Sequence, residues 1–304
     1  MKDTKGSGRR SPVALTALAL VLVAAMFALA ACGSSSSSSN DSGSGSSSSG
    51  GSSTTSSDNG SGLKPVNSGK LTVGMNLQFR PEMYLQGGQP AGYDVELLRL
   101  LAPAAGVRLN IQNLDFNGLI PGLQAKKFDM VSVGLSATPE RRQVVDFSRP
   151  YVPYAQILGV PAGRASSVTS IAQLNQKGRT IVALQGSTAE TTARRVFPNA
   201  TVDSLPDQNA AFLQVATGRA DGIVVEDYLL AQFTASNPGR LAPSAISRPL
   251  DLEYGSYAVP KGNDAFVSFL NRWICERQAD GTLERIYRQQ FSVRTMPPMP
   301  ACPA

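Results

Sequence analysis

The stretch from Phe116 to Ser148, FNGLIPGLQAKKFDMVSVGLSATPERRQVVDFS, carries the strongest indication of the fold. It predicts a helix, then a buried strand over Met130–Gly134, and then a second helix that begins at TPE, residues 138–140. Thr is a favoured N-cap, Pro fits the first helical position, and an acid is favourable in the first turn. Arg141 therefore lies on the first turn just after a strand, where a guanidinium beside backbone N–H groups is suited to bind a carboxylate. From the helix position alone, a solvated surface arginine is the alternative.

Outward from this stretch, residues 63–304 alternate apolar strand-like runs with helical patterns, which predicts an α/β fold. Strands are expected at Lys70–Asn76, Val107–Leu114, Met130–Gly134, Thr180–Leu184, Thr201–Leu205 and Gly222–Val225. Helices are expected at Asp94–Ala105, Phe116–Lys126, Ser170–Lys177, Thr188–Val196, Asp207–Thr217, Asp227–Ala235, Asp264–Gln278 and Thr282–Gln290.

Two extended, Gly-interrupted apolar runs, near 154–160 and 252–259, are interpreted as chain crossings. Two crossings predict a bilobed domain over 63–304, each lobe with a mixed sheet flanked by helices and the two joined by a two-crossing hinge. Lobe 1 would comprise about 63–154 and 253–304, and lobe 2 about 155–252.

The composition excludes several kinds of chemistry. The 304 residues include no histidine, so Ser-His-Asp and Cys-His nucleophile systems and His-ligated zinc are excluded. Three cysteines cannot form a four-sulfur metal site. The net charge is +6, but residues 1–31 contribute +3 of it, and no basic block with interleaved aromatics indicates a nucleic-acid partner.

The N-terminus is predicted to be a targeting signal. Four basic residues within 1–10 precede an apolar run over 13–29, as in a secretory signal peptide covering 1–31. The run ends in LAACG at 29–33, which resembles the bacterial lipobox, so Cys32 is predicted to take a thioether-linked lipid carrying fatty acids such as palmitate. A plain signal peptide cut nearby and an uncleaved signal anchor are the alternatives.

The segment after Cys32 is predicted to be a flexible tether. Residues 33–62 contain 17 Ser and 7 Gly and cannot form a hydrophobic core. With Cys32, this segment would connect the membrane to the folded domain.

From Leu71 onward the sequence resembles the bacterial extracellular solute-binding proteins of family 3, the polar amino-acid receptors of ABC importers. The Phe116–Ser148 stretch carries most of the resemblance, and GYDVELL at 92–98 and LQGST at 184–188 agree in order and spacing. The resemblance covers nearly all of 70–292. It implies a two-lobed periplasmic-binding-protein fold of type II, without catalytic residues, metal or cofactor.

The resemblance also implies a ligand site. Arg141 would hold the ligand α-carboxylate, and Asp227 would receive the α-ammonium. The other residues that the family's motifs place in the site are Phe79, Phe116, Gly134, Ser136, Leu184 and Thr188, together with Asn76. For Asp227 an N-cap role is the alternative, and for the two phenylalanines it is core packing. Asn76 departs from an Asp often found there and leaves the ligand type open, while Glu226 adds a charge beside Asp227.

Cys275 and Cys302 remain after lipidation of Cys32. Outside the cytoplasm an even pair is interpreted as a disulfide that fixes the Pro-rich tail, whereas in the cytoplasm both would be free thiols.

The expected function is that of a monomeric, lipid-anchored receptor on the outer face of the bacterial cell membrane. It would capture a polar amino acid between its lobes for an ABC permease and its ATPase. One alternative is an enzyme on the same fold, similar to cyclohexadienyl dehydratases, with Glu226 as the acid. The other is a ligand-sensing subunit, which usually has a second membrane span and a cytoplasmic module, neither of which follows the domain before Ala304.

Overall fold

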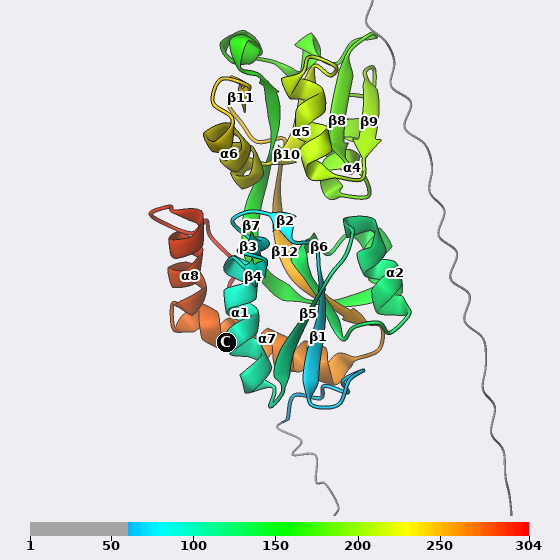
Figure 1. Cartoon of the computed structure of the whole chain (residues 1–304), viewed down its shortest axis with the longest axis vertical. Helices are drawn as coiled ribbons and strands as arrows, with labels where there is room; N and C mark the ends of the chain where they lie inside the picture. Colours follow the sequence, from blue (N-terminus) through cyan, green and yellow to red (C-terminus); the bar gives the residue numbers. More distant parts are fainter. Residues whose placement is uncertain (1–59, 304) are drawn as a thin grey trace, which may run out of the picture. The chain divides into compact units, whose positions relative to one another are not determined.

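The computed structural model describes residues 60–303. The predicted signal peptide, the lipidation at Cys32 and nearly all of the tether lie outside the described residues. The described residues form an α/β fold with two lobes, as predicted, and two long strands run from one lobe into the other (Figure 1).

One continuous nine-stranded sheet connects both lobes, in the order β5-β1-β6-β12-β7-β10-β8-β9, with β11 also paired to β7. The strands of lobe 1 are β1 (Lys70–Met75), β5 (Arg108–Asn113) and β6 (Met130–Ser136). Those of lobe 2 are β8 (Thr180–Leu184), β9 (Thr201–Leu205), β10 (Gly222–Glu226) and β11 (Leu241–Pro243). The shared strands are β7 (Val145–Pro161) and β12 (Asp251–Pro260). A second, small sheet contains β2 (Gln78–Phe79), β3 (Met83–Gln86) and β4 (Gln89–Ala91).

The sheet is mixed because β7 and β12 run against their neighbours. β1 pairs in parallel with β5 and β6, and β8 pairs in parallel with β9 and β10. β7 and β12 are antiparallel to each other from Asp251↔Gln156 to Pro260↔Val145, with irregularities near Ser256. Positions 154 and 253, where the predicted lobe boundaries fall, lie within these two strands. Hydrogen bonding along the paired strands thus continues through the hinge.

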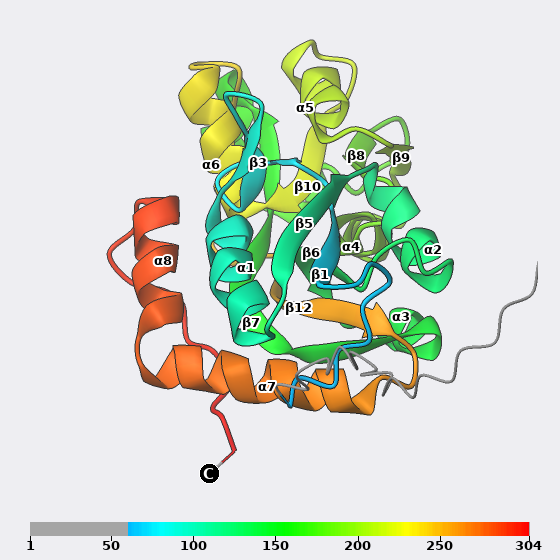
Figure 2. The ribbon, with the colours of Figure 1, turned by 60° about the horizontal axis from the view of Figure 1, so that its bottom comes forward.

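Helices cover both faces of the sheet (Figures 1 and 2). They are α1 (Tyr93–Ala104), α2 (Leu119–Gln124), α3 (Pro139–Val144), α4 (Thr188–Val196), α5 (Gln208–Ala216), α6 (Asp227–Ser236), α7 (Asp264–Ala279) and α8 (Thr282–Phe291). Short 3₁₀ segments occur at Phe116–Gly118, Ala162–Ser167 and Ile171–Gln173. On β8, Val182 and Leu184 join one apolar core while Ile181 and Ala183 join the other, because alternate side chains of a strand point to opposite faces.

The predicted helix over Ser170–Lys177 was wrong. Only Ile171–Gln173 is helical, as a 3₁₀ turn. The Gln173 side chain accepts hydrogen bonds from the N–H groups of Thr169 and Ser170 at 2.8 and 2.9 Å and donates to Ser167 O at 2.8 Å. These bonds belong to a capping box at Ser170, so the segment begins as a helix does, but the helical turn ends at Gln173.

Candidate ligand-binding site

A cavity lies where lobe 1 and lobe 2 meet. Its free volume is about 30 Å³ in this arrangement of the lobes. The lobe 1 residues that line it come mainly from β6 and from α3, and those of lobe 2 from β8, α4, β10 and α6. Its lining comprises Phe79, Phe116, Val133, Gly134, Leu135, Ser136, Arg141, Tyr154, Leu184, Ser187, Thr188, Glu226, Tyr228 and Leu229.

Arg141 enters this cavity from the first turn of α3. The Thr138 hydroxyl caps the helix by accepting the Arg141 N–H at 3.3 Å, and Pro139 occupies the first turn. The guanidinium donates to Ser136 O at 2.9 Å and, across the lobes, to Gly186 O at 3.0 Å. Burial lowers the pKa of Arg141 below its ordinary value, but an arginine remains charged. The guanidinium has further N–H groups that bond to no other described residue and are available to an anion.

Gly134 and Ser136 form part of the lobe 1 wall. The Ser136 hydroxyl lies 2.5 Å from the Tyr154 hydroxyl and also hydrogen-bonds to the Glu253 carboxylate. Tyr154 further donates to Gly134 O at 3.0 Å. Gly134 has φ +56°, and a Cβ there would come within 2.4 Å of Glu82 Oε1, so both the backbone conformation and the space require glycine.

Phe79 and Phe116 form an aromatic wall on the lobe 1 side. Their rings meet edge to face, with centroids 6.3 Å apart. The Arg141 guanidinium carbon lies 6.0 Å from the Phe116 ring centroid, within the range of a cation–π contact. A ligand side chain that packed against these rings would therefore contact apolar surface.

Lobe 2 contributes Leu184, Ser187 and Thr188 around the start of α4. Ser187 is the N-cap and accepts the Glu190 N–H at 3.2 Å. Thr188 Oγ1 accepts a hydrogen bond from Gln156 Nε2 at 2.9 Å. The amino end of this helix therefore borders the cavity, where its partial positive charge favours an anion.

Glu226, and not the neighbouring Asp227, lines the cavity. Glu226 is the last residue of β10, and its carboxylate has no hydrogen bond or ion pair with another residue in 60–303. Burial raises its pKa to about 7. The Asp227 carboxylate instead accepts the N–H groups of Ala155 at 3.4 Å and Tyr228 at 3.0 Å. Asp227 is the first residue of α6, and the N-cap position belongs to Glu226, so the structure does not bear out the N-cap role that was the alternative interpretation for Asp227.

Asn76 also lies outside the cavity lining. Its Nδ2 donates to Leu114 O at 2.7 Å, and its Oδ1 accepts from Gln78 Nε2 at 2.5 Å. Gln78 Oε1 in turn accepts the Gln208 N–H of lobe 2 at 3.1 Å. The amide at position 76 therefore supports an interlobe contact and does not face the ligand space.

A second interlobe contact involves a buried glutamate that the sequence did not single out. Glu82, 1 % exposed, accepts a hydrogen bond from the Tyr228 hydroxyl of α6. Burial, assisted by repulsion from Asp94, raises the pKa of Glu82 well above its ordinary value. Asp94, held by Ser132 at 2.5 Å and Tyr151 at 2.6 Å, has its pKa raised by burial to about 7. In the sequence, the only indication that Glu82 is buried was its position between the apolar residues Pro81 and Met83.

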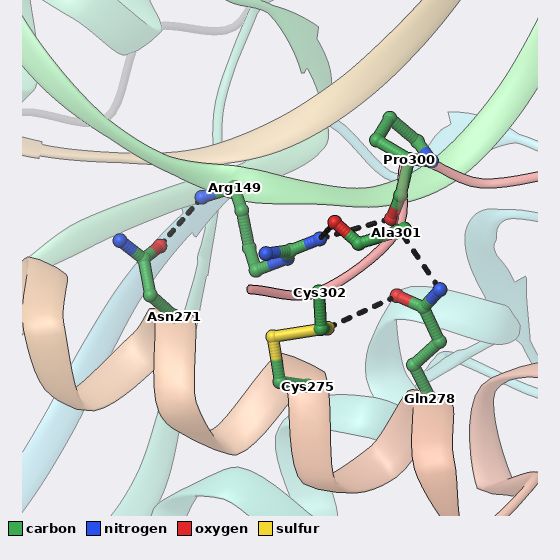
Figure 3. Close-up of a disulfide and its surroundings, with 7 residues drawn as sticks. All are labelled: Arg149, Asn271, Cys275, Gln278, Pro300, Ala301 and Cys302. Atoms are coloured by element: carbon green, nitrogen blue, oxygen red, sulfur yellow. Dashed lines mark hydrogen bonds between the residues drawn. A yellow bond between two sulfur atoms is a disulfide. The ribbon is translucent and has the colours of Figure 1, made fainter. Parts of the chain in front are cut away.

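The two C-terminal cysteines are bonded to each other. Cys275 on α7 and Cys302 in the tail form a disulfide (Figure 3). The tail also receives hydrogen bonds from Arg149 of β7, at 2.9 Å to Pro300 O and 3.0 Å to Ala301 O. The disulfide and Arg149 fix the tail against lobe 1.

Residues 60–303 lack two further features. No helix in this range is both long and apolar enough to cross a bilayer. The same range contains no group of three or more Cys, Asp and Glu side chains arranged to hold a metal ion.

Residues 71–293 match the sequence profile of the bacterial extracellular solute-binding proteins, family 3. The chain belongs to this family. The chain is 29% identical to the arginine-binding extracellular protein ArtP of Bacillus subtilis, over 73% of this chain and 86% of the relative. It is 25% identical to the cyclohexadienyl dehydratase of Pseudomonas aeruginosa, over 72% of this chain and 82% of the relative.

The fold agrees with solved family structures. The amino acid ABC transporter substrate-binding protein AbpA of Streptococcus pneumoniae, bound to L-arginine, matches with a TM-score of 0.68 and 27% identity, covering 74% of this chain and 95% of that structure. The two-lobed type II fold predicted from the sequence is thus confirmed. Most of the relatives are amino-acid-binding proteins, which supports amino-acid binding by this chain and an extracytoplasmic location.

Proposed function

We propose that this protein is an extracytoplasmic receptor that binds one amino acid between its lobes and delivers it to an ABC importer. The observation that carries the proposal is that Arg141 from lobe 1 and Glu226 from lobe 2 line the same cavity. A guanidinium with free N–H groups and an unpaired carboxylate are complementary to the two ends of a zwitterion.

Each lining group has a role in this proposal. Arg141 binds the α-carboxylate, assisted by the start of α4 at Thr188. Glu226 receives the α-ammonium, the role that the sequence resemblance assigned to Asp227. Ser136 and Gly134 border the zwitterion, and Phe79, Phe116 and Leu184 contact the side chain.

Ligand binding would control the closure of the two lobes. Because Arg141 and Glu226 come from different lobes, a ligand that contacts both stabilises the closed arrangement. A membrane permease with its ATPase would recognise the closed form. The receptor acts as a monomer in this scheme and needs neither a metal nor a cofactor.

The lipid anchor at Cys32 is part of the proposal. It places the protein on the outer face of the cell membrane, with residues 33–62 as the tether. Growth with a clickable fatty acid should label the wild-type chain and not Cys32→Ala. Absence of label, or label that survives the substitution, would exclude this anchor.

Calorimetric titration of the full chain, purified in detergent, with each of the twenty amino acids tests the binding function. At least one amino acid should bind with a Kd at or below about 10 μM, equivalent to about −7 kcal/mol. If none binds, the receptor proposal fails.

Glu226 also supports a second candidate function. A cavity carboxyl with a pKa of about 7 can act as a general acid near neutral pH, and a cyclohexadienyl dehydratase is among the relatives. Incubation with a cyclohexadienyl carboxylate, followed by ultraviolet detection of an aromatic product, tests it. Turnover that Glu226→Gln abolishes would favour the enzyme, and no turnover above that of Glu226→Gln would remove it.

A further inference from the structure

The charged groups of the cavity are matched to one zwitterion, with no charge left over. Among the lining residues the ionisable side chains are Arg141, Tyr154, Glu226 and Tyr228. Tyr154 is engaged with Gly134 O and Ser136, and Tyr228 with Glu82. If Arg141 binds the α-carboxylate and Glu226 the α-ammonium, no lining charge is available to the ligand side chain.

The neutral polar groups of the lining are largely engaged as well. Ser136 bonds to Tyr154 and Glu253, Ser187 donates to Leu184 O at 2.7 Å, and Thr188 accepts from Gln156. The nearby amides of Asn76 and Gln78 are occupied by each other and by Leu114 O and the Gln208 N–H. A polar side chain would find few free partners.

The remainder of the lining is apolar. Lobe 1 contributes Phe79, Phe116, Val133 and Leu135. Lobe 2 contributes Leu184 and Leu229. Moving a charged side chain from water into such surroundings without a partner costs several kcal/mol. An apolar side chain is instead favoured by burial, at about 25 cal/mol per Å².

We infer that the ligand of this site is an α-amino acid with an uncharged, apolar side chain of the leucine, methionine or phenylalanine kind. This inference rests on the proposed function and specifies its substrate class. It separates this protein from its relatives ArtP, which is named for arginine, and AbpA, whose structure holds arginine.

Two carboxylates next to the lining, Glu82 and Glu253, could accept a cationic side chain instead. Glu253 is engaged by the hydroxyls of Ser136 and Tyr154 and is not a lining residue, which leaves Glu82. Its Oε1 has no hydrogen-bond partner among the described residues, and it lies against Gly134 of the lining. However, Glu82 is not itself part of the lining, it is 1 % exposed, and its Oε2 is bonded to Tyr228. Glu82 therefore contacts the lining residues Gly134 and Tyr228 without lining the ligand space itself.

The test is a calorimetric comparison of leucine, methionine and phenylalanine with arginine, lysine, histidine and glutamate, on the full chain and on Glu82→Gln. Glutamine can still accept the Tyr228 hydroxyl but cannot ionise, so this variant removes the negative charge that a bound cation would require of Glu82 and little else. We expect at least one of the apolar amino acids to bind about 100-fold more tightly than every charged one, since an unpaired buried charge costs about 3 kcal/mol or more. Glu82→Gln should keep this ranking.

Each other outcome overturns the inference. Tightest binding of arginine or lysine, lost in Glu82→Gln, would show that Glu82 reads a cationic side chain, while the receptor function would stand. Tightest binding of histidine or glutamate would likewise overturn the inference of an apolar ligand, while the receptor function would stand. If no amino acid binds, the proposed function and this inference fail together.

Discussion

The Arg141 guanidinium of lobe 1 donates to the Gly186 carbonyl oxygen of lobe 2, with Nη2 and O 3.0 Å apart. A second N–H of the same group donates to Ser136 O, within lobe 1, at 2.9 Å. The residue proposed to bind the ligand carboxylate is therefore also a bridge between the lobes. Under the proposed function, ligand recognition and lobe closure would use the same side chain.

Arg141→Lys should lower amino-acid affinity by about 100-fold, because lysine cannot present the planar pair of N–H donors. Calorimetry measures the change. Arg142→Lys is the matched control, since Arg142 donates to Ala137 O on the protein surface at 3.0 Å and does not line the cavity. Equal losses in both variants, or none in Arg141→Lys, would contradict the role of Arg141.

Glu226→Gln and Asp227→Asn form a matched pair that separates the two adjacent acids. The first should lower affinity by about 100-fold, because it removes the partner of the buried ammonium. The second should change affinity by less than about threefold and the free energy of unfolding by less than about 1 kcal/mol, because the favourable position at the helix start is offset by burial, which raises the pKa of Asp227. A large loss of affinity in Asp227→Asn with little change in Glu226→Gln would instead assign binding of the ligand ammonium to Asp227.

Acidification should weaken binding. The unliganded pKa of Glu226 is raised to about 7, and only the ionised carboxylate pairs with an ammonium. Protons therefore compete with the ligand below pH 7, and affinity should fall by up to about tenfold per pH unit towards pH 5. Glu226→Gln should lack this dependence. A wild-type affinity that is constant from pH 8 to pH 5 would contradict the proposed role of the ionised Glu226 carboxylate.

The unliganded protein should be more stable at pH 5 than at pH 8. In the folded state the pKa values of Asp94 and Glu226 are raised to about 7, and that of Glu82 is raised well above its ordinary value. Between the unfolded values near 4 and pH 7 the folded state binds more protons, so the free energy of unfolding decreases as pH rises, by an amount on the order of several kcal/mol. Urea unfolding at several pH values measures it. Stability that rises over this range would show that these carboxyls are paired when folded.

Removal of the disulfide should destabilise the fold and leave the site intact. Cys275 and Cys302 are 27 residues apart, and closing a loop of that length is worth about 3 kcal/mol in the chain-entropy account. Cys302→Ser should lower the free energy of unfolding by about 2–4 kcal/mol with unchanged affinity. Ala301→Ser is the neighbouring control. If Cys302→Ser also weakened binding severalfold, the tail would have a role at the hinge that its lobe 1 contacts do not explain.

Much of the fold follows from local sequence patterns. Thr138, Pro139 and Glu140 predicted the start of α3, and with it the place of Arg141, because capping depends on neighbouring residues only. The helix over Thr188–Val196 and the strand over Thr180–Leu184 were predicted with the observed bounds. By contrast, Ser170–Lys177 has the capping box of a helix start, yet only Ile171–Gln173 is helical, and neither capping nor periodicity reveals where the turn ends.

The candidate site was predictable only where a motif fixed its residues. Six of the residues that the resemblance implied besides Arg141 line the cavity, namely Phe79, Phe116, Gly134, Ser136, Leu184 and Thr188. Two neighbouring acids, Glu226 and Asp227, could not be distinguished, because β10 ends at the first and α6 begins at the second, and the sequence does not show which side chain this strand-to-helix junction directs into the cavity. The Glu82–Tyr228 contact joins positions 146 residues apart and has no local signature.

The most direct measurement of the central claim compares the best-binding amino acid with its decarboxylated amine and its deaminated acid. Calorimetry on the full chain should show binding of the amino acid and a loss of about 100-fold or more for each analogue, since each leaves Arg141 or Glu226 buried without a partner. The amine should regain no affinity in Arg141→Lys, because lysine is still an unpaired cation, whereas the acid should regain part of its affinity in Glu226→Gln, because the unpaired carboxylate is gone. Binding of either analogue as tight as that of the amino acid would contradict recognition of a zwitterion between these two residues.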